Sequence, residues 1–83
     1  MKILDIGCGL RKYKPKQKNA RVIGLDIVKL PGVDVVHDLE KSPLPFKDNE
    51  FDTVIANHVL EHVKNLISVI HEIWRITKRY GLF

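Results

Sequence analysis

The sequence predicts an α/β fold built on a mostly parallel sheet of about four strands, in one domain spanning residues 1–83. The main observation is a set of four short runs rich in Ile, Leu and Val, each closed by glycine or a polar residue. These runs are Lys2–Ile6, Val22–Leu25, Val33–Val36 and Phe51–Ala56. Short apolar runs of this kind are typical of parallel strands that are covered on both faces.

A second observation is one clear helical periodicity. Apolar residues recur at three- and four-residue steps between Asn65 and Lys78, whereas Glu72 and Arg75 fall off that stripe. Asn65 precedes the first apolar position, so we expect it to be the N-cap of a helix over 65–78. The preceding segment, His58–Lys64, is expected to form a helical turn or two.

Two stretches are expected to be irregular. Gly9–Ala20 contains Pro15 and leaves little room for a long helix between the first two strands. Ser42–Pro45 contains two prolines, each of which restricts itself and the residue before it, so we expect an extended or turn conformation there.

Composition limits the class of protein. Hydrophobic residues make up 45% of the chain and charged residues 29%, which predicts a packed core and argues against disorder. No apolar run approaches the roughly 20 residues that span a bilayer, and Asp5 stands where a signal peptide would be apolar. We therefore expect a cytoplasmic protein without membrane contact. Cys8 is the single cysteine, and we expect it to be a small buried residue.

The net charge of +4 is unevenly distributed. Six of the basic residues fall within positions 11–21: Arg11, Lys12, Lys14, Lys16, Lys18 and Arg21. This basic segment has two interpretations. It is a solvated loop, or it contacts phosphate in RNA or another anionic partner.

A candidate binding site begins at the end of the first strand, in the turn Asp5-Ile6-Gly7-Cys8-Gly9. Glycine in such a turn allows unusual backbone angles and lets a ligand approach the main chain. Asp26 ends the second strand, where a carboxylate can accept the hydroxyl hydrogens of a ribose. The pattern is typical of nucleotide-like cofactor binding.

Further motifs follow in a fixed order, and the chain contains LDIGCG, VIGLDI, VVHDLE, PLPFKDNEFDTVIANHVLEH and EIWRITKRYG. In this order, over Ile3 to Gly81, the sequence resembles the class I S-adenosylmethionine-dependent methyltransferases. The resemblance implies a Rossmann-like three-layer fold with strand order 3-2-1-4 and S-adenosyl-L-methionine as cofactor.

The resemblance also implies roles for individual residues. The glycine turn would lie against the methionine part of the cofactor, Asp26 would hold the ribose, and Asp38 with Leu39 would meet the adenine edge. The cofactor-binding positions it implies are Asp5, Gly7, Gly9, Asp26, Ile27, Asp38, Leu39 and Asn57. The candidate catalytic residues are Asn57, His58 and His62, which would lie toward the methyl acceptor. His58 and His62 would share one helical face, but no third ligand accompanies them, so we expect no metal.

The sequence departs from the family at three points. Arg11 stands where the family has a third glycine, and Lys78-Arg79-Tyr80-Gly81 replaces a Lys-Pro-Gly-Gly motif. The fifth strand and later elements of the family are expected to be missing. Phe51–Ala56 would then be an exposed edge, and exposed edges pair with other chains, so we expect a homodimer or larger homo-oligomer.

Three functions remain open from the sequence. The first is a methyltransferase with an unidentified acceptor. The second is a truncated, non-catalytic binding module that acts in a homo- or hetero-oligomer. The third, a dinucleotide-binding domain, is disfavoured because its glycine pattern requires glycine where this chain has Lys12.

Overall fold

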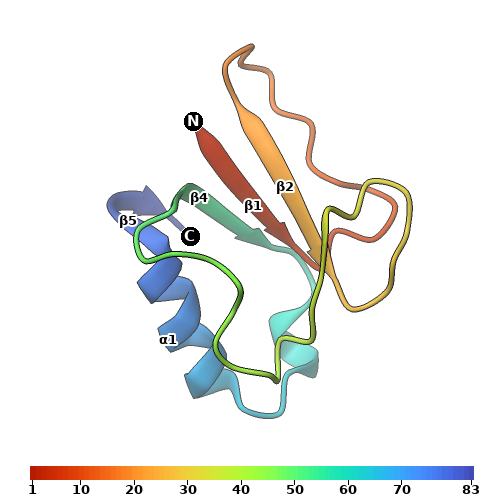
Figure 1. Ribbon diagram of the computed structural model, residues 1–83, viewed down its shortest axis with the longest axis vertical. Helices are drawn as coiled ribbons and strands as arrows, with labels where there is room; N and C mark the ends of the chain where they lie inside the picture. Colours follow the sequence, from red (N-terminus) through yellow and green to blue (C-terminus); the bar gives the residue numbers. More distant parts are fainter.

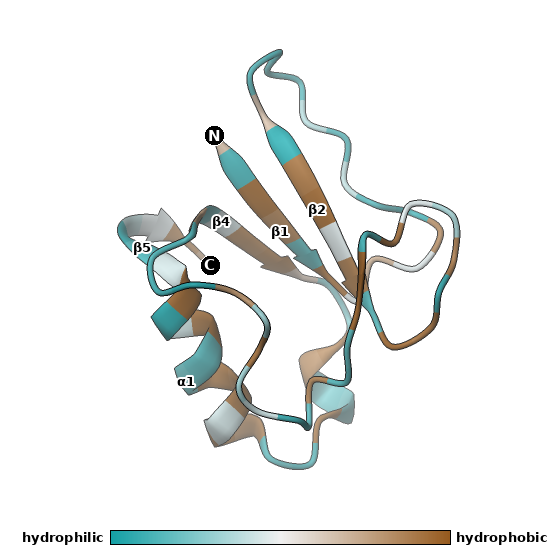
Figure 2. Cartoon of the chain, viewed as in Figure 1, coloured by the Kyte–Doolittle hydropathy of each residue, from teal (hydrophilic) through white to brown (hydrophobic).

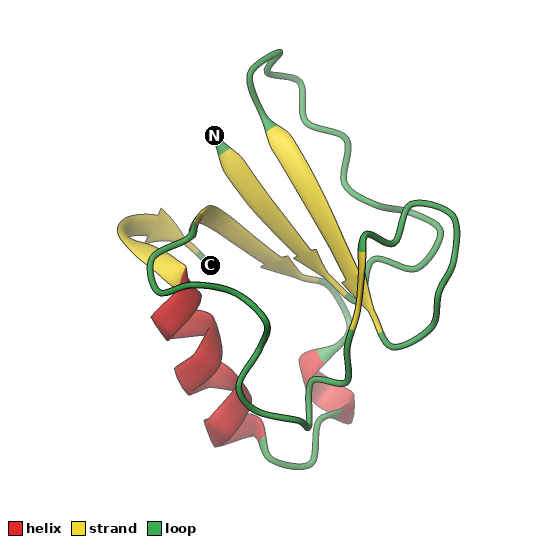
Figure 3. Cartoon of the chain, viewed as in Figure 1, coloured by secondary structure: helices red, strands yellow, loops and turns green.

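The computed structural model describes all residues 1–83 and contains a five-stranded sheet with the order β3-β2-β1-β4-β5 (Figure 1). The strands are β1 (Lys2–Ile6), β2 (Arg21–Asp26), β3 (Val35–Val36), β4 (Phe51–Ala56) and β5 (Thr77–Leu82). One α-helix, α1 (Leu66–Ile76), and one 3-10 turn, η1 (Leu60–His62), complete the structure (Figure 3). The predicted α/β class and the order 3-2-1-4 are confirmed.

All the strands pair in parallel, with β1 in the centre. Asp5 of β1 is aligned with Gly24 of β2 on one side and with Ile55 of β4 on the other. The arrowheads of β1, β2 and β4 therefore point to the same edge of the sheet (Figure 1). Ligands of open parallel sheets bind at this carboxyl edge.

Helix α1 covers one face of the sheet and closes the hydrophobic core. The nine core residues come from three strands, the helix and one loop: Leu4, Ile6, Leu25, Leu44, Phe51, Val54, Val69, Ile73 and Ile76. Figure 2 shows the same apolar character along β1, β2, β4 and the inner side of α1. Burial of each large side chain contributes roughly 1.5–3 kcal/mol. No helix is long and apolar enough to cross a membrane.

The helix begins where the sequence predicts and ends earlier. Asn65 is the N-cap, and its side chain accepts a hydrogen bond from the Ser68 N–H at 3.3 Å. The predicted end at Lys78 is wrong, because the backbone becomes extended at Thr77. The Thr77 N–H and the Thr77 hydroxyl both donate to the Ile73 carbonyl, the hydroxyl at 2.6 Å, so Thr77 closes the last turn of the helix.

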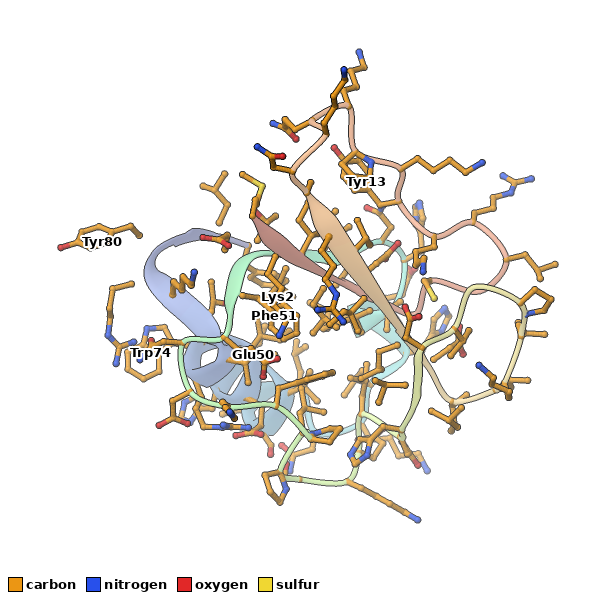
Figure 4. All side chains as sticks on the ribbon, turned by 45° about the horizontal axis from the view of Figure 1, so that its top comes forward. Lys2, Tyr13, Glu50, Phe51, Trp74 and Tyr80 are labelled. Atoms are coloured by element: carbon orange, nitrogen blue, oxygen red, sulfur yellow. The ribbon has the colours of Figure 1, made fainter.

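The prediction that β4 forms the edge of the sheet is wrong. Residues 77–82, which the sequence presents as the helix end and a closing motif, form β5 beside β4. The pairing is irregular, since Phe51 is aligned with Thr77 and Thr53 with Leu82. The middle of β5 therefore bulges outward, and Tyr80 points into solvent (Figure 4). Because β5 covers β4, the reason for expecting a homodimer through β4 no longer holds.

The opposite face of the sheet is covered by a loop instead of a helix. The segment between β1 and β2 contains no helix, as predicted (Figure 3). It crosses the sheet where Asp5 and Gly24 face away from α1. The Tyr13 N–H donates to Asp5 Oδ2 at 2.8 Å, and a Cβ on Gly24 would lie 2.8 Å from Lys12 Cδ and 2.7 Å from Cys8 Sγ. The Gly32 carbonyl would also lie 2.8 Å from that Cβ, and because this contact is with backbone, position 24 requires glycine.

A charged clamp holds the segment before β4 against α1. The Arg75 guanidinium donates to the carbonyls of Leu44 and Phe46 at 3.1 and 2.9 Å and forms ion pairs with Asp48 and Glu72, both at 2.8 Å. The hydrogen bond from Arg75 holds the pKa of Glu72 below its usual range. This clamp fixes a proline-containing segment that has no regular secondary structure, as predicted.

A second set of charges closes the amino end of the sheet. Lys2, Glu50 and Phe51 lie together in Figure 4. The Lys2 ammonium forms an ion pair with Glu50 and lies 5.4 Å from the centre of the Phe51 ring. Phe46 packs edge-on against Phe51, with ring centres 5.0 Å apart. These contacts anchor the start of β4 next to the start of β1.

Candidate functional site

The candidate site lies at the carboxyl edge, where the glycine turn follows β1. Gly7 and Gly9 have φ angles of +68° and +53°, which residues other than glycine rarely adopt. A Cβ on Gly7 would lie 2.2 Å from Val59 Cγ2, so the turn and the segment after β4 can approach only with glycine there. Gly7 separates two hollows of different chemistry.

The first hollow, here called the acidic hollow, has apolar walls and acidic side chains. It is lined by Gly7, Leu25, Asp26, Ile27, His37, Asp38, Leu39, Glu40, Val59, His62 and Val63. The second, here called the polar hollow, is lined by Asp5, Gly7, Cys8, Leu10, Arg11, Tyr13, Asn57 and His58. Both hollows therefore include Gly7.

The site residues that the sequence predicts divide between these hollows. Gly7, Asp26, Ile27, Asp38 and Leu39 line the acidic hollow. Asp5, Gly7 and Asn57 line the polar hollow. Gly9 lines neither hollow, and its N–H donates to Asp26 Oδ2 at 2.8 Å. Gly9 thus positions Asp26 by a main-chain contact.

Asp26 is already engaged by the main chain. Besides the bond from Gly9, its Oδ1 accepts from the N–H groups of Ile27 and Val28 at 2.7 and 3.3 Å. A carboxylate offers about four acceptor positions, so one stays available to a ligand. Accepting two ribose hydroxyls requires Asp26 to release one bond, and the longest is that from Val28.

Asp38 and Leu39 form a turn at the other side of the acidic hollow. Asp38 Oδ1 accepts from the Glu40 N–H at 2.9 Å. The Leu39 N–H has no hydrogen-bond partner within the protein. A carboxylate and a free main-chain donor are therefore adjacent in this hollow, which is a combination that hydrogen-bonds the edge of a heterocyclic base.

Asp5 and Asn57 give the polar hollow its acceptors. Asp5 is buried, with 6% of its surface exposed, and burial raises the pKa of its carboxyl although the Tyr13 N–H and Lys12 oppose this. Its Oδ1 has no hydrogen-bond partner in the protein. The Asn57 side chain is exposed and also unpaired. Both groups are free to contact a ligand.

The two histidines do not share a helical face, contrary to the prediction. His58 has a φ angle of +57°, which ends any helical path before η1 begins. His58 lines the polar hollow, whereas His62 lines the acidic hollow. Each has a ring nitrogen 3.8 Å from Glu61 Oε1, and their side chains are 93% and 79% exposed. No group of three or more His, Cys, Asp or Glu residues is arranged to hold a metal ion.

The structure adds residues that sequence reasoning did not identify. Val59 and Val63 form apolar walls of the acidic hollow, and His37 lies at its rim with Nε2 2.7 Å from the Lys41 carbonyl. Their positions depend on the turn at His58 and on a loop, for which the sequence carries no periodic signal. Cys8 is buried, as predicted, and burial raises the pKa of its thiol, with Asp5 and Asp26 adding to the effect.

Residues 4–83 match the family model described as a methyltransferase domain. The chain belongs to this family. The match extends over the glycine turn, both hollows, α1 and β5, and it confirms the resemblance inferred from the ordered motifs.

Relatives of this methyltransferase domain come from several kingdoms. An uncharacterized protein of Methanocaldococcus jannaschii is 38% identical over 86 residues, which cover 95% of this chain and 37% of the relative. A sterol 24-C-methyltransferase of Gibberella zeae is 34% identical over 100 residues, which cover 100% of this chain and 26% of that protein. The chain thus spans well under half the length of these relatives.

Solved structures share its fold. A candidate S-adenosyl-L-methionine-dependent methyltransferase of Methanococcus maripaludis superposes with a TM-score of 0.74 at 21% identity, covering 96% of this chain and 44% of that one. The trans-methyltransferase CalH, solved as a complex with SAH, gives a TM-score of 0.72 at 23% identity over 98% of this chain and 30% of CalH. At this level of identity the likeness concerns the fold.

Proposed function

We propose that this methyltransferase domain binds S-adenosyl-L-methionine along the carboxyl edge of the sheet, as the cofactor-binding part of a methyltransferase. One observation carries the proposal: two hollows of different chemistry meet at Gly7, a residue without a side chain. The cofactor has a nucleoside end and an amino acid end joined at a sulfonium. Gly7 is where the junction of those ends would cross the main chain.

The acidic hollow suits the adenosine end. Its apolar walls, including Leu25 and Val59, offer a slot for a flat base. Asp38 and the Leu39 N–H would hydrogen-bond the adenine edge, and Ile27 would lie beside the ring. Asp26 would accept from the ribose hydroxyls, as carboxylates do at the end of the second strand in open sheets.

The polar hollow suits the methionine end. Asp5 and Asn57 present free oxygen atoms that would accept hydrogen bonds from an ammonium group. The carboxylates of Asp5 and Asp26 also lie near the turn, where they would favour the positive sulfonium. Gly7 would let that atom lie close to the backbone.

The bound cofactor would supply an activated methyl group, and the protein's task would be to align the acceptor with it. Alignment of reacting groups accounts for much of the rate in such direct displacements. Asn57 and His58 line the hollow beside the turn and are the candidates to face the acceptor. A general base is required only if the acceptor must lose a proton before attack, and His58 is the candidate for that role.

Calorimetric titration tests the proposal. We expect S-adenosyl-L-methionine and S-adenosylhomocysteine to bind with one site per chain and NAD not to bind. NAD is the appropriate comparison because it shares the adenosine end and lacks the amino acid end. Absence of heat with both sulfur compounds, measured on folded protein, would refute the proposed function.

A second candidate is a cofactor-binding module without transferase activity. The exposure of His58 and His62, and the lack of any hydrogen bond that orients either ring, favour it. The two functions differ in turnover. A transferase would release labelled S-adenosylhomocysteine when mixed with cofactor and a pool of metabolites or RNA, whereas the module would bind the cofactor and leave it unchanged.

A further inference from the structure

The glycine turn has few main-chain donors left for a ligand. Between positions 7 and 13, most N–H groups bond within the protein: those of Gly7, Cys8, Gly9, Arg11 and Tyr13. Only the N–H groups of Leu10 and Lys12 in this stretch have no partner. No helix follows the turn either, so the N–H groups of a helix N-terminus are not available to an anion.

An amino acid ligand nevertheless needs donors, because its carboxylate is negatively charged. The polar hollow contains one cationic side chain, that of Arg11. Arg11 is exposed, and its guanidinium takes part in no ion pair and no hydrogen bond. Its backbone is fixed all the same, because its N–H donates to the Cys8 carbonyl at 3.0 Å.

We propose that Arg11 binds the carboxylate of the methionine part of the cofactor, an inference that rests on the proposed function. The Arg11 side chain would supply the donors that the main chain of this turn has already used. A guanidinium matches a carboxylate through two parallel hydrogen bonds.

The hollow is then complementary to both charges of an amino acid. Asp5 lies in it with a free oxygen for the ammonium, and Arg11 provides the donors for the carboxylate. The neighbouring Lys12 is not equivalent, because its ammonium is paired with Asp34 at 3.1 Å. Arg11 also borders another hollow with Lys14 and Pro31, which contains no acidic residue to pair with an ammonium.

The test compares two ligands that differ only in the carboxylate: S-adenosyl-L-methionine and its decarboxylated form. We expect Arg11→Ala to weaken binding of S-adenosyl-L-methionine by about 10- to 100-fold, the range of losing charged hydrogen bonds. It should leave the affinity for the decarboxylated compound unchanged. Arg11→Lys should lose less affinity for S-adenosyl-L-methionine than Arg11→Ala, because lysine keeps the positive charge although it cannot form two parallel hydrogen bonds.

Lys16→Ala is the matched control, since it removes one exposed positive charge from the same loop and lines neither hollow. Its affinity for both ligands should equal that of the wild type. Equal losses for both ligands in Arg11→Ala, or no loss for either, would overturn the role of Arg11 while leaving cofactor binding intact. Failure of the wild type to bind either ligand would instead refute the proposed function.

Discussion

The two faces of the sheet are built in different ways. On the α1 face, buried aliphatic side chains and the Arg75 clamp hold helix, loop and strands together. On the opposite face, one loop crosses the strands through a few main-chain contacts, such as that of Tyr13 with Asp5. We therefore expect the α1 face to contribute most of the stability, and the carboxyl edge and the loop to provide the ligand contacts. Mutations should therefore separate stability from binding.

The largest effect is expected in the core. Ile73→Ala should lower the free energy of unfolding by about 2–5 kcal/mol, because it leaves a cavity under a fully packed helix. Ile67→Ala, on the exposed side of α1, should change it by less than about 0.5 kcal/mol. Urea denaturation followed by circular dichroism measures both. Similar losses for the two variants would show that the α1 face does not hold the stability.

Removing the clamp should have the next largest effect. Arg75→Met removes the guanidinium from Glu72, Asp48 and two carbonyls, and leaves Glu72 with only the Leu44 N–H as a donor. We expect a loss of about 2–3 kcal/mol in the free energy of unfolding, since hydrogen bonds to charged groups contribute about that much. Lys78→Met, whose ammonium contacts Asp52 at 3.2 Å on the surface, is the control and should have little effect. Unchanged stability in Arg75→Met would show that the clamp does not stabilise the α1 face.

At the carboxyl edge, Asp26→Ala should weaken cofactor binding by about 1–3 kcal/mol. Asp34→Ala is the matched variant on the loop face, because Asp34 accepts from the Gly24 N–H and Lys12 and lines neither hollow. It should lower the melting temperature and leave the affinity nearly unchanged. If Asp34→Ala weakened cofactor binding as much as Asp26→Ala, residues of the loop face would contribute to binding as much as residues of the carboxyl edge.

Acid should act first on the paired carboxylates. The pKa of Glu72 is lowered by Arg75, and that of Asp34 by the Gly24 N–H and Lys12. Each contributes stability that is present above its unfolded pKa and lost as pH falls through its folded pKa. Asp5 acts oppositely, because its pKa is raised by burial. We expect stability to fall as the pH drops below about 5, and less steeply in Glu72→Gln. An unchanged slope would exclude the clamp as the acid-sensitive part.

The smallest effect concerns the basic segment at positions 11–21. If it contacts RNA, the logarithm of the association constant for an RNA pool should fall linearly with the logarithm of the salt concentration. The double variant Lys14→Ala/Lys16→Ala should show a smaller slope. Fluorescence anisotropy at several salt concentrations measures it. A segment that is only solvated would give no saturable binding at any salt concentration. The phosphate contact stays a prediction until then.

Strands with a strong apolar run were predictable to within one residue, since β2 extends one residue beyond the predicted Val22–Leu25 at each end. Elements whose structure depends on their neighbours were not predictable. The bounds of β1 and β4 agree with the sequence prediction. The third strand is shorter than the predicted Val33–Val36, because the Val33 N–H donates to the Leu30 carbonyl in a turn and cannot pair with β2. The segment Thr77–Leu82 was missed, since its charged middle has no strand pattern and its pairing depends on β4.

The location of the predicted site residues could be inferred from the sequence, whereas their hydrogen bonds could not. The glycine turn and Asp26 lie at the carboxyl edge because parallel strands end there. That Asp26 would already accept three main-chain hydrogen bonds follows from the local path of the loop, which no spacing reveals. The prediction that His58 and His62 share a helical face was wrong, because His58 adopts a positive φ angle and therefore lies outside any helix.

The passage from α1 to β5 takes place without any connecting residue, because Ile76 ends the helix and Thr77 begins the strand. One additional residue at this junction would turn every following side chain of β5 to the other side of the sheet. The turn at 17–20 joins an irregular loop to β2, so an additional residue before this turn would leave the side chains of β2 on the same faces of the sheet. The chain can therefore be lengthened by insertion before β2, whereas the junction of 76 and 77 should tolerate no change in length.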